Sequence, residues 1–188
     1  MKSALDAEIL DRLSNEIRTS LSKDGKEDSK KKDRFAERCG LTSLSSRGSF
    51  AALVGVHEDL PEVVIKVVPN YDMFLPFAEG VLDGRYKHKW FPKVYSVTRL
   101  ETHSIVTLEL LPDPCSDYDK GGYFDRLVRT GSKYCDRKIE RDFVRIVEEF
   151  CLDNPRAQTD FHSDNIRQRS KGGKVIIDPF WSTTRTAE

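Results

Sequence analysis

Residues 160–165 read Asp160-Phe161-His162-Ser163-Asp164-Asn165, and shortly afterwards the apolar stretch Val175-Ile176-Ile177 ends at Asp178. The pattern is a carboxylate, an amide five residues later and, after a short hairpin, a second carboxylate. A carboxylate at the end of a buried apolar strand is costly unless it meets a cation. We therefore expect the second half of the chain to fold around a loop and a hairpin that bring these groups to one cation.

These residue types suit phosphoryl transfer. In enzymes that transfer phosphate from ATP, an aspartate orients the acceptor hydroxyl, and an asparagine five residues later binds Mg²⁺ with a second aspartate. Asp160 fits the catalytic position, and Asn165 and Asp178 fit the metal positions. His162, inside the pattern D-x-H-x-x-N, is a further catalytic candidate. Each residue taken singly also suits a structural role, as a turn former or as the cap of a strand.

An upstream lysine supplies the fourth group. Lys66 interrupts the apolar run Val63-Val64-Ile65-Lys66-Val67-Val68, which reads as a β-strand. A lysine in such a place either extends to water at the edge of the sheet or meets a buried anion. In the functional interpretation Lys66 neutralises the phosphates of ATP, and an acid of the next helix holds it. Glu79 is the first candidate for that acid, and Asp72 and Asp83 are the alternatives.

A small-residue turn before this strand is the candidate phosphate loop. Small side chains let backbone N–H groups come close to phosphate oxygens. Gly48 alone remains of the three glycines of a G-x-G-x-x-G loop, so an ordinary Ser/Gly-rich hairpin is the competing interpretation. The residues expected to contact the cofactor here are Ser46, Arg47, Gly48, Ser49 and Phe50.

Composition excludes some partners. The chain has 188 residues, 38% hydrophobic and 33% charged, with 31 basic and 31 acidic residues. A balanced charge gives no global field for nucleic acid or an anionic membrane, so any steering must be local. No stretch approaches the roughly 20 apolar residues of a membrane-spanning helix. We therefore expect a cytoplasmic protein with no membrane partner and no direct contact with nucleic acid.

The chain divides into three segments that differ in composition and in the spacing of apolar residues. Residues 1–22 have apolar residues at helical spacing and predict an amphipathic helix. Residues 23–40 begin as a charged stretch without apolar residues and predict an exposed linker. Residues 41–188 then form one domain, in which the prolines at 112 and 114 separate an N-lobe, 41–111, from a C-lobe, 112–188.

The order of the predicted elements defines the fold class. In the N-lobe, strands at 50–56 and 62–68 precede a helix at 71–86 and strands at 93–97 and 104–110. In the C-lobe, helices at 123–130 and 136–152 precede the loop at Asp160. Trp90-Phe91-Pro92 is expected to pack in the core rather than to stack on bases. The prediction is an α+β, two-lobed, protein-kinase-like fold with a small antiparallel β-sheet N-lobe and a reduced, mainly helical C-lobe.

From about residue 41 to residue 181 the chain resembles the early serine/threonine protein kinases of T-seven-like bacteriophages. The segments that carry the resemblance are Gly48–Ala52, Val64–Val67, Phe91–Tyr95, Asp160–Ile166 and Ile177–Pro179. It implies ATP- and Mg²⁺-dependent phosphorylation of host proteins, including transcription and RNA-processing machinery, and of the chain itself, in the bacterial cytoplasm. It also implies that Glu109 to Leu111 form a hinge whose backbone meets adenine, which makes Glu109 and Leu111 cofactor-binding candidates.

Two other functions fit the same residues. The missing glycines and the short C-lobe are compatible with a pseudokinase-like inhibitor that binds a host protein without catalysis. The pattern D-x-H-x-x-N also occurs in small-molecule phosphotransferases, although the chain after Asp178 is short for a substrate pocket.

Overall fold

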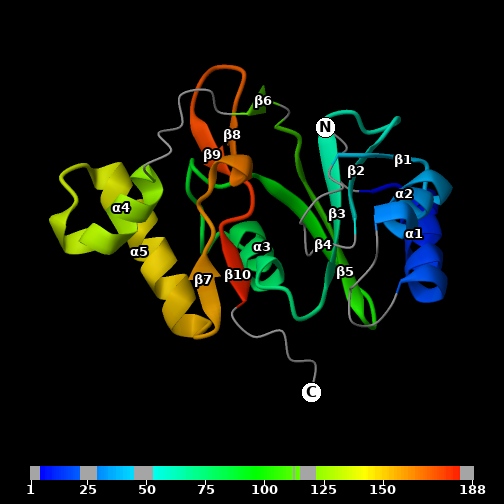
Figure 1. The fold of residues 1–188 in the computed structure, drawn as a ribbon, viewed down its shortest axis with the longest axis horizontal. Helices are drawn as coiled ribbons and strands as arrows, with labels where there is room; N and C mark the ends of the chain where they lie inside the picture. The colour runs from blue at the N-terminus through cyan, green and yellow to red at the C-terminus, as the bar shows by residue number, and fades with distance from the viewer. Residues whose placement is uncertain (1–4, 22–28, 45–52, 112, 115–121, 183–188) are drawn as a thin grey trace. The chain divides into compact units, whose positions relative to one another are not determined.

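The computed structural model describes residues 5–21, 29–44, 53–111, 113–114 and 122–182 (Figure 1). The fold class is α+β, as the sequence predicts, with a five-stranded antiparallel sheet among the described residues. The chain divides into two compact units. Unit 1 comprises residues 1–82 and 93–110, and unit 2 comprises residues 83–92 and 111–188.

The sheet of unit 1 has the strand order β1-β2-β3-β5-β4, and every neighbouring pair is antiparallel. The apolar run around Lys66 forms β3 in the centre of the sheet, and all its residues are buried. β3 pairs with β2 along one edge and with β5 along the other, so its β-branched side chains pack against cross-strand neighbours from both strands. The strands are β1 Leu41–Ser43, β2 Leu53–His57, β3 Val63–Pro69, β4 Val94–Arg99 and β5 His103–Glu109.

Helices α1 (Ala7–Ser20) and α2 (Ser29–Arg38) belong to the core of unit 1. Asp6 begins α1, because its side chain accepts a hydrogen bond from the Glu8 N–H at 3.0 Å. The buried residues of both helices share one cluster with β1, β2, β3 and β5; the members are Ile9, Leu13, Ile17, Phe35, Ala36, Cys39, Leu41, Leu53, Ile65, Val67 and Ile105. The N-terminal helix is therefore part of the packed unit that contains the sheet.

The segment expected as a charged linker, 23–40, contains α2. Its first part, 23–28, lies outside the described residues. The later part is helical because Phe35 and Ala36 give the segment an apolar side that packs into the core. Tertiary packing thus stabilises a helix that the charged residues alone do not predict.

Helix α3 (Phe74–Leu82) lies between β3 and β4 in the chain. The Asp72 carboxylate accepts a hydrogen bond from the Phe74 N–H at 2.8 Å and thereby caps the first turn. The helix is shorter than the predicted 71–86 and ends before Gly84, which has a φ of 87°. Gly84 adopts this left-handed conformation without the strain that a side chain would add.

Unit 2 contains the two predicted helices, now seen as α4 (Tyr123–Thr130) and α5 (Lys138–Asp153), with a short 3-10 helix, Ser132–Tyr134, between them. Strands β7 (Ala157–Thr159) and β10 (Phe180–Ser182) pair antiparallel. A second small sheet has the order β6-β8-β9. Its strands are Asp113–Pro114, Ile166–Gln168 and Lys174–Ile176.

Aromatic side chains form the core of unit 2. Phe143 of α5 contacts the rings of Trp90, Phe91, Phe124 and Phe161, with centroids between 5.2 and 5.8 Å from its own. Trp90 is therefore a packing residue, as the sequence predicts. The core draws together segments that are far apart in the sequence, including the stretch 83–92 that interrupts unit 1 in the chain.

None of the helices in the described part of the chain is long and apolar enough to cross a membrane.

Candidate functional site

The loop that begins at Asp160 is anchored by backbone bonds. It follows β7, and the Asp160 N–H donates to the Pro179 carbonyl at 2.8 Å. It ends in a single 3-10 turn, Ser163–Asn165, before β8 begins. Because β7 pairs with β10, the loop lies next to the segment that contains Asp178.

Asn165 joins this loop to the Asp178 segment. Its side-chain Nδ2 donates to the carbonyl oxygens of Asp160 and Asp178, each at 3.0 Å. The backbone carbonyl of Asn165 accepts a hydrogen bond from the Ile177 N–H at 2.8 Å. The structure therefore brings together three residues of the predicted site, Asp160, Asn165 and Asp178. With Nδ2 directed at the two carbonyls, Oδ1 is the amide atom that remains for a cation.

Asp160 and His162 form a close polar pair. The distance between His162 Nε2 and Asp160 Oδ1 is 3.3 Å, and the Asp160 side chain is 34% exposed. Burial raises the pKa of Asp160 above its ordinary value, and the charge of Asp178 acts in the same direction. His162 and the Asn165 amide oppose this shift in pKa. A carboxylate whose environment favours the protonated form is suited to accept a proton from a hydroxyl.

A half-open hollow of about 460 Å³ gives access to Asp160. Residues of the loop line one side of it, and the start of α4 lines the other; the set is Gly122, Asp125, Thr159, Asp160, Phe161, His162 and Ser163. Gly122 has a φ of 77°, and a Cβ there would lie 3.0 Å from Asp125 Oδ2. Only glycine fits this position without strain. Sequence reasoning did not identify Gly122 and Asp125, because only the packing of α4 in unit 2 places them beside the loop.

The donor set fits Mg²⁺. Among the described residues, no three His, Cys, Asp or Glu side chains converge as a metal-binding group. Mg²⁺ does not require such a group, because it keeps several waters and binds through one or two carboxylates and the phosphates of its substrate. The Asp178 carboxylate and the Asn165 amide oxygen are ligands of the kind that this ion prefers.

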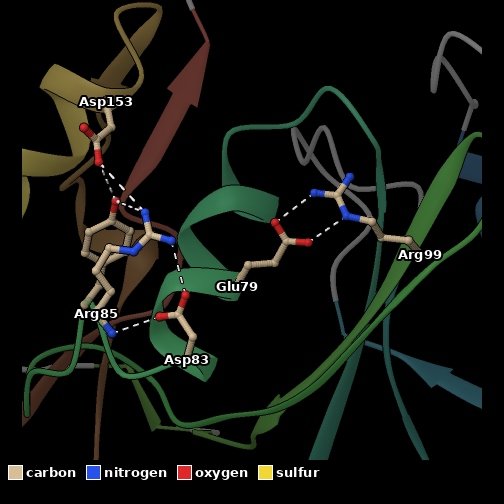
Figure 2. Close-up of polar contacts among 6 residues, drawn as sticks. Glu79, Asp83, Arg85, Arg99 and Asp153 are labelled. Atoms are coloured by element: carbon tan, nitrogen blue, oxygen red, sulfur yellow. Dashed lines mark hydrogen bonds and ion pairs between the residues drawn. The ribbon is translucent and has the colours of Figure 1, made fainter.

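In unit 1, Lys66 and Glu79 have well-defined neighbours. Lys66 is 6% exposed, and its Nζ lies 3.6 Å from the centroid of the Phe74 ring. Glu79 of α3 accepts two hydrogen bonds from Arg99 of β4, at 2.7 and 2.8 Å (Figure 2). The structure thus gives Glu79 a bidentate arginine partner that the sequence did not suggest. The expected pair between Lys66 and Glu79 stays a prediction.

The alternative acids for Lys66 also have structural roles. Asp72 caps α3. Asp83 accepts hydrogen bonds from the backbone N–H and the guanidinium of Arg85, at 2.9 and 3.2 Å (Figure 2).

The other candidates for contact with the nucleotide are placed as follows. Ser46, Arg47, Gly48, Ser49 and Phe50 lie outside the described residues. Glu109 ends β5, and its carboxylate accepts a hydrogen bond from the Lys93 N–H at 2.9 Å. Leu111 is 9% exposed and is the residue at which the chain enters unit 2. The expectation that residues 109–111 meet adenine stays a prediction.

No family model matches the chain, and no curated protein matches it.

Proposed function

We propose that the chain is an ATP-dependent serine/threonine protein kinase with a two-lobed, protein-kinase-like fold. One observation carries this proposal. The Asn165 amide bonds the backbone carbonyls of both Asp160 and Asp178, so that the candidate catalytic residue and the two candidate metal ligands are joined to one another through the backbone. Phosphoryl transfer depends mostly on such positioning and on neutralisation of charge.

Each residue has a distinct role in this proposal. Asp160 orients the acceptor hydroxyl and accepts its proton, and the hollow beside it admits the acceptor side chain. His162 positions the Asp160 carboxylate from 3.3 Å. Asn165 and Asp178 would hold Mg²⁺, which when bound neutralises phosphate charge. Lys66 would bind the phosphates, and the backbone of residues 109–111 would bind adenine.

The resemblance to phage early kinases suggests the biological setting. In this proposal the chain acts in the cytoplasm of a bacterial host and phosphorylates host proteins on serine or threonine. Transcription and RNA-processing proteins are the first substrates to test, together with the chain itself.

The test is transfer of labelled γ-phosphate from ATP with Mg²⁺ to a bacterial lysate and to the chain itself. Asp160→Asn and Asp178→Asn should reduce transfer by at least about a hundredfold, because each change removes a charged group placed at the reaction. Asp164→Asn is the matched control, because it makes the same change at an exposed position of the same loop. Equal transfer by all four proteins, or no transfer by the wild type, contradicts the proposal.

The pairing of Glu79 with Arg99 favours a second candidate function, a non-catalytic inhibitor. If Glu79 stays bound to Arg99 and does not pair with Lys66, the chain binds a host protein without turning over ATP. Thermal unfolding with and without Mg²⁺ and ATP separates the two functions. Ligand at about 100 times its dissociation constant should stabilise a nucleotide-binding protein by about 2.7 kcal/mol. Absence of any shift, together with absence of transfer, supports the inhibitor.

A further inference from the structure

Two stretches of unit 2 are rich in basic residues and contain no acidic residue. They are residues 84–92 and 165–177. Their basic residues are Arg85, Lys87, Lys89, Arg167, Arg169, Lys171 and Lys174. The whole chain has 31 basic and 31 acidic residues. Within these two stretches the basic charge is therefore not balanced by acidic residues, although the whole chain has no net charge.

The fold brings these two stretches side by side. The guanidinium of Arg169 donates to the carbonyl of Lys89 at 2.6 Å and to that of Phe91 at 3.2 Å. The Ile176 N–H donates to the Trp90 carbonyl at 2.8 Å. Lys89 and Arg169 are 80 residues apart in the sequence, so this juxtaposition exists only in the folded unit. We call Lys87, Lys89, Arg169 and Lys171 the basic surface.

The lysines of the basic surface are accessible. Lys87, Lys89 and Lys171 are exposed, and none of them forms an ion pair with another residue that the structure describes. Arg85 differs, because its guanidinium forms ion pairs with Asp83 and Asp153 (Figure 2); the distances are 3.2 and 3.9 Å.

Besides Asp83 and Asp153, a further acid lies close to this region. The charge of Asp142 acts on His88, which separates Lys87 from Lys89 in the chain. Asp142 forms an ion pair with Lys138. Its carboxylate is thus neutralised by a residue that is not part of the basic surface.

We propose that the basic surface binds the sugar–phosphate backbone of a nucleic acid without reading its sequence. Protein interfaces need apolar or aromatic anchors at their centre. Among the described residues of unit 2, the large apolar residues that are exposed are Tyr134, Leu152 and Trp181, and none of them lies in the two basic stretches. Phosphate groups need only cations and backbone donors.

Base stacking is not part of this contact. The Trp90 ring packs edge-on against Phe124 and Phe143, with centroids 5.1 and 5.2 Å away. A ring held in the core in this way offers no platform for a base. The expected partner is a single-stranded or double-stranded nucleic acid that is recognised by charge alone.

The experiment measures fluorescence anisotropy of the full chain with a labelled 20-nucleotide RNA and with the corresponding DNA duplex, from 50 to 200 mM salt. Lys89→Gln/Lys171→Gln should weaken binding about tenfold at low salt and should reduce the salt slope by about one for each lysine removed. Arg129→Gln/Lys133→Gln is the matched control, because it removes the same charge from exposed positions elsewhere in unit 2. This control should bind nearly as well as the wild type.

Poly-glutamate of equal charge is the competing partner. If it displaces the RNA at an equal concentration of charges, the surface is a site for acidic polypeptides and the proposal is wrong. Failure of the wild type to bind either nucleic acid, or equal weakening by the two double variants, also overturns it. Thermal unfolding of both variants verifies that each one is folded.

Discussion

Asn165 holds Asp178 through its backbone: Asn165 Nδ2 lies 3.0 Å from the Asp178 carbonyl oxygen and equally close to that of Asp160. One amide group thereby ties together the backbones of two aspartates that are 18 residues apart in the sequence. The consequence is structural as well as functional, because the same side chain contributes to stability and to the geometry of the site.

Asn165→Ala should destabilise the fold by about 1–3 kcal/mol, because it removes both hydrogen bonds and leaves two partly buried carbonyls without this donor. Urea unfolding measures the change. Asn154→Ala is a suitable comparison, because Asn154 makes a single such bond, to the Phe150 carbonyl at 2.9 Å. A loss for Asn165→Ala no larger than that for Asn154→Ala contradicts a joining role.

Asp160→Asn should raise the melting temperature by about 1–3 °C at neutral pH while it reduces phosphate transfer. Burial raises the folded-state pKa of Asp160 above its ordinary value of 3.8. When the pKa of an acid is higher in the folded state than in the unfolded state, its contribution to stability is fully present at pH values below the unfolded-state pKa. This contribution is lost as the pH rises through the folded-state pKa. Ionised Asp160 is therefore a cost at pH 7. The higher melting temperature of the variant should disappear near pH 3.5. If the difference in melting temperature between the variant and the wild type stays the same from pH 7 to pH 3.5, the raised pKa of Asp160 is contradicted.

The structure explains which parts of the fold could be predicted from the sequence. The apolar run around Lys66 and the helical spacing within 123–130 and 136–152 are local signals, and all three elements formed near their predicted bounds. Helix α2 was missed because its stabilising contact, through Phe35, is made with distant strands. The inclusion of residues 83–92 in unit 2 was missed for the same reason, since it depends on contacts such as that of Arg169 with Lys89.

Some residues of the candidate site could likewise be predicted from the sequence, and others could not. Asp160, Asn165 and Asp178 could be grouped from the sequence, because a short hairpin connects them and limits their separation. The pairing of Glu79 with Arg99 could not be predicted, since it joins a helix to a strand that follows it by a long connection. Gly122 and Asp125 line the hollow through the packing of α4, which no local pattern specifies.

His88 should make stability depend on pH. Its Nδ1 accepts a hydrogen bond from the Trp90 N–H at 3.1 Å, and its Nε2 lies 3.1 Å from the Ile139 carbonyl, an arrangement that suits the neutral ring. Burial lowers the pKa of His88 below its ordinary value of 6.5. The unfolded chain then binds the proton more readily, so this part of the stability is present above pH 6.5 and is lost as pH falls below it.

His88→Gln should reduce this pH dependence, because glutamine stays neutral and can still donate to the Ile139 carbonyl. Urea unfolding at pH 7.5, 6.5 and 5.5 tests it. The wild type should lose stability by at most about 1.4 kcal/mol per pH unit through this group, and the variant should lose correspondingly less. Parallel curves for the two proteins contradict the role of His88.

Lys66→Met should separate stability from activity. The Lys66 side chain is buried in the sheet, with Nζ 3.6 Å from the Phe74 ring centroid. Methionine has a similar shape and keeps the packing of the side chain, but it loses the charge and the cation–π contact with the Phe74 ring, which is worth about 0.5–2 kcal/mol. The variant should therefore still fold, which thermal unfolding verifies. Phosphate transfer and the thermal shift with ATP should nevertheless be lost, because methionine cannot neutralise phosphate.

Lys87→Met, at an exposed position, should change neither measurement. A Lys66→Met variant that transfers phosphate at the wild-type rate would show that Lys66 is a structural residue and that the nucleotide is held elsewhere.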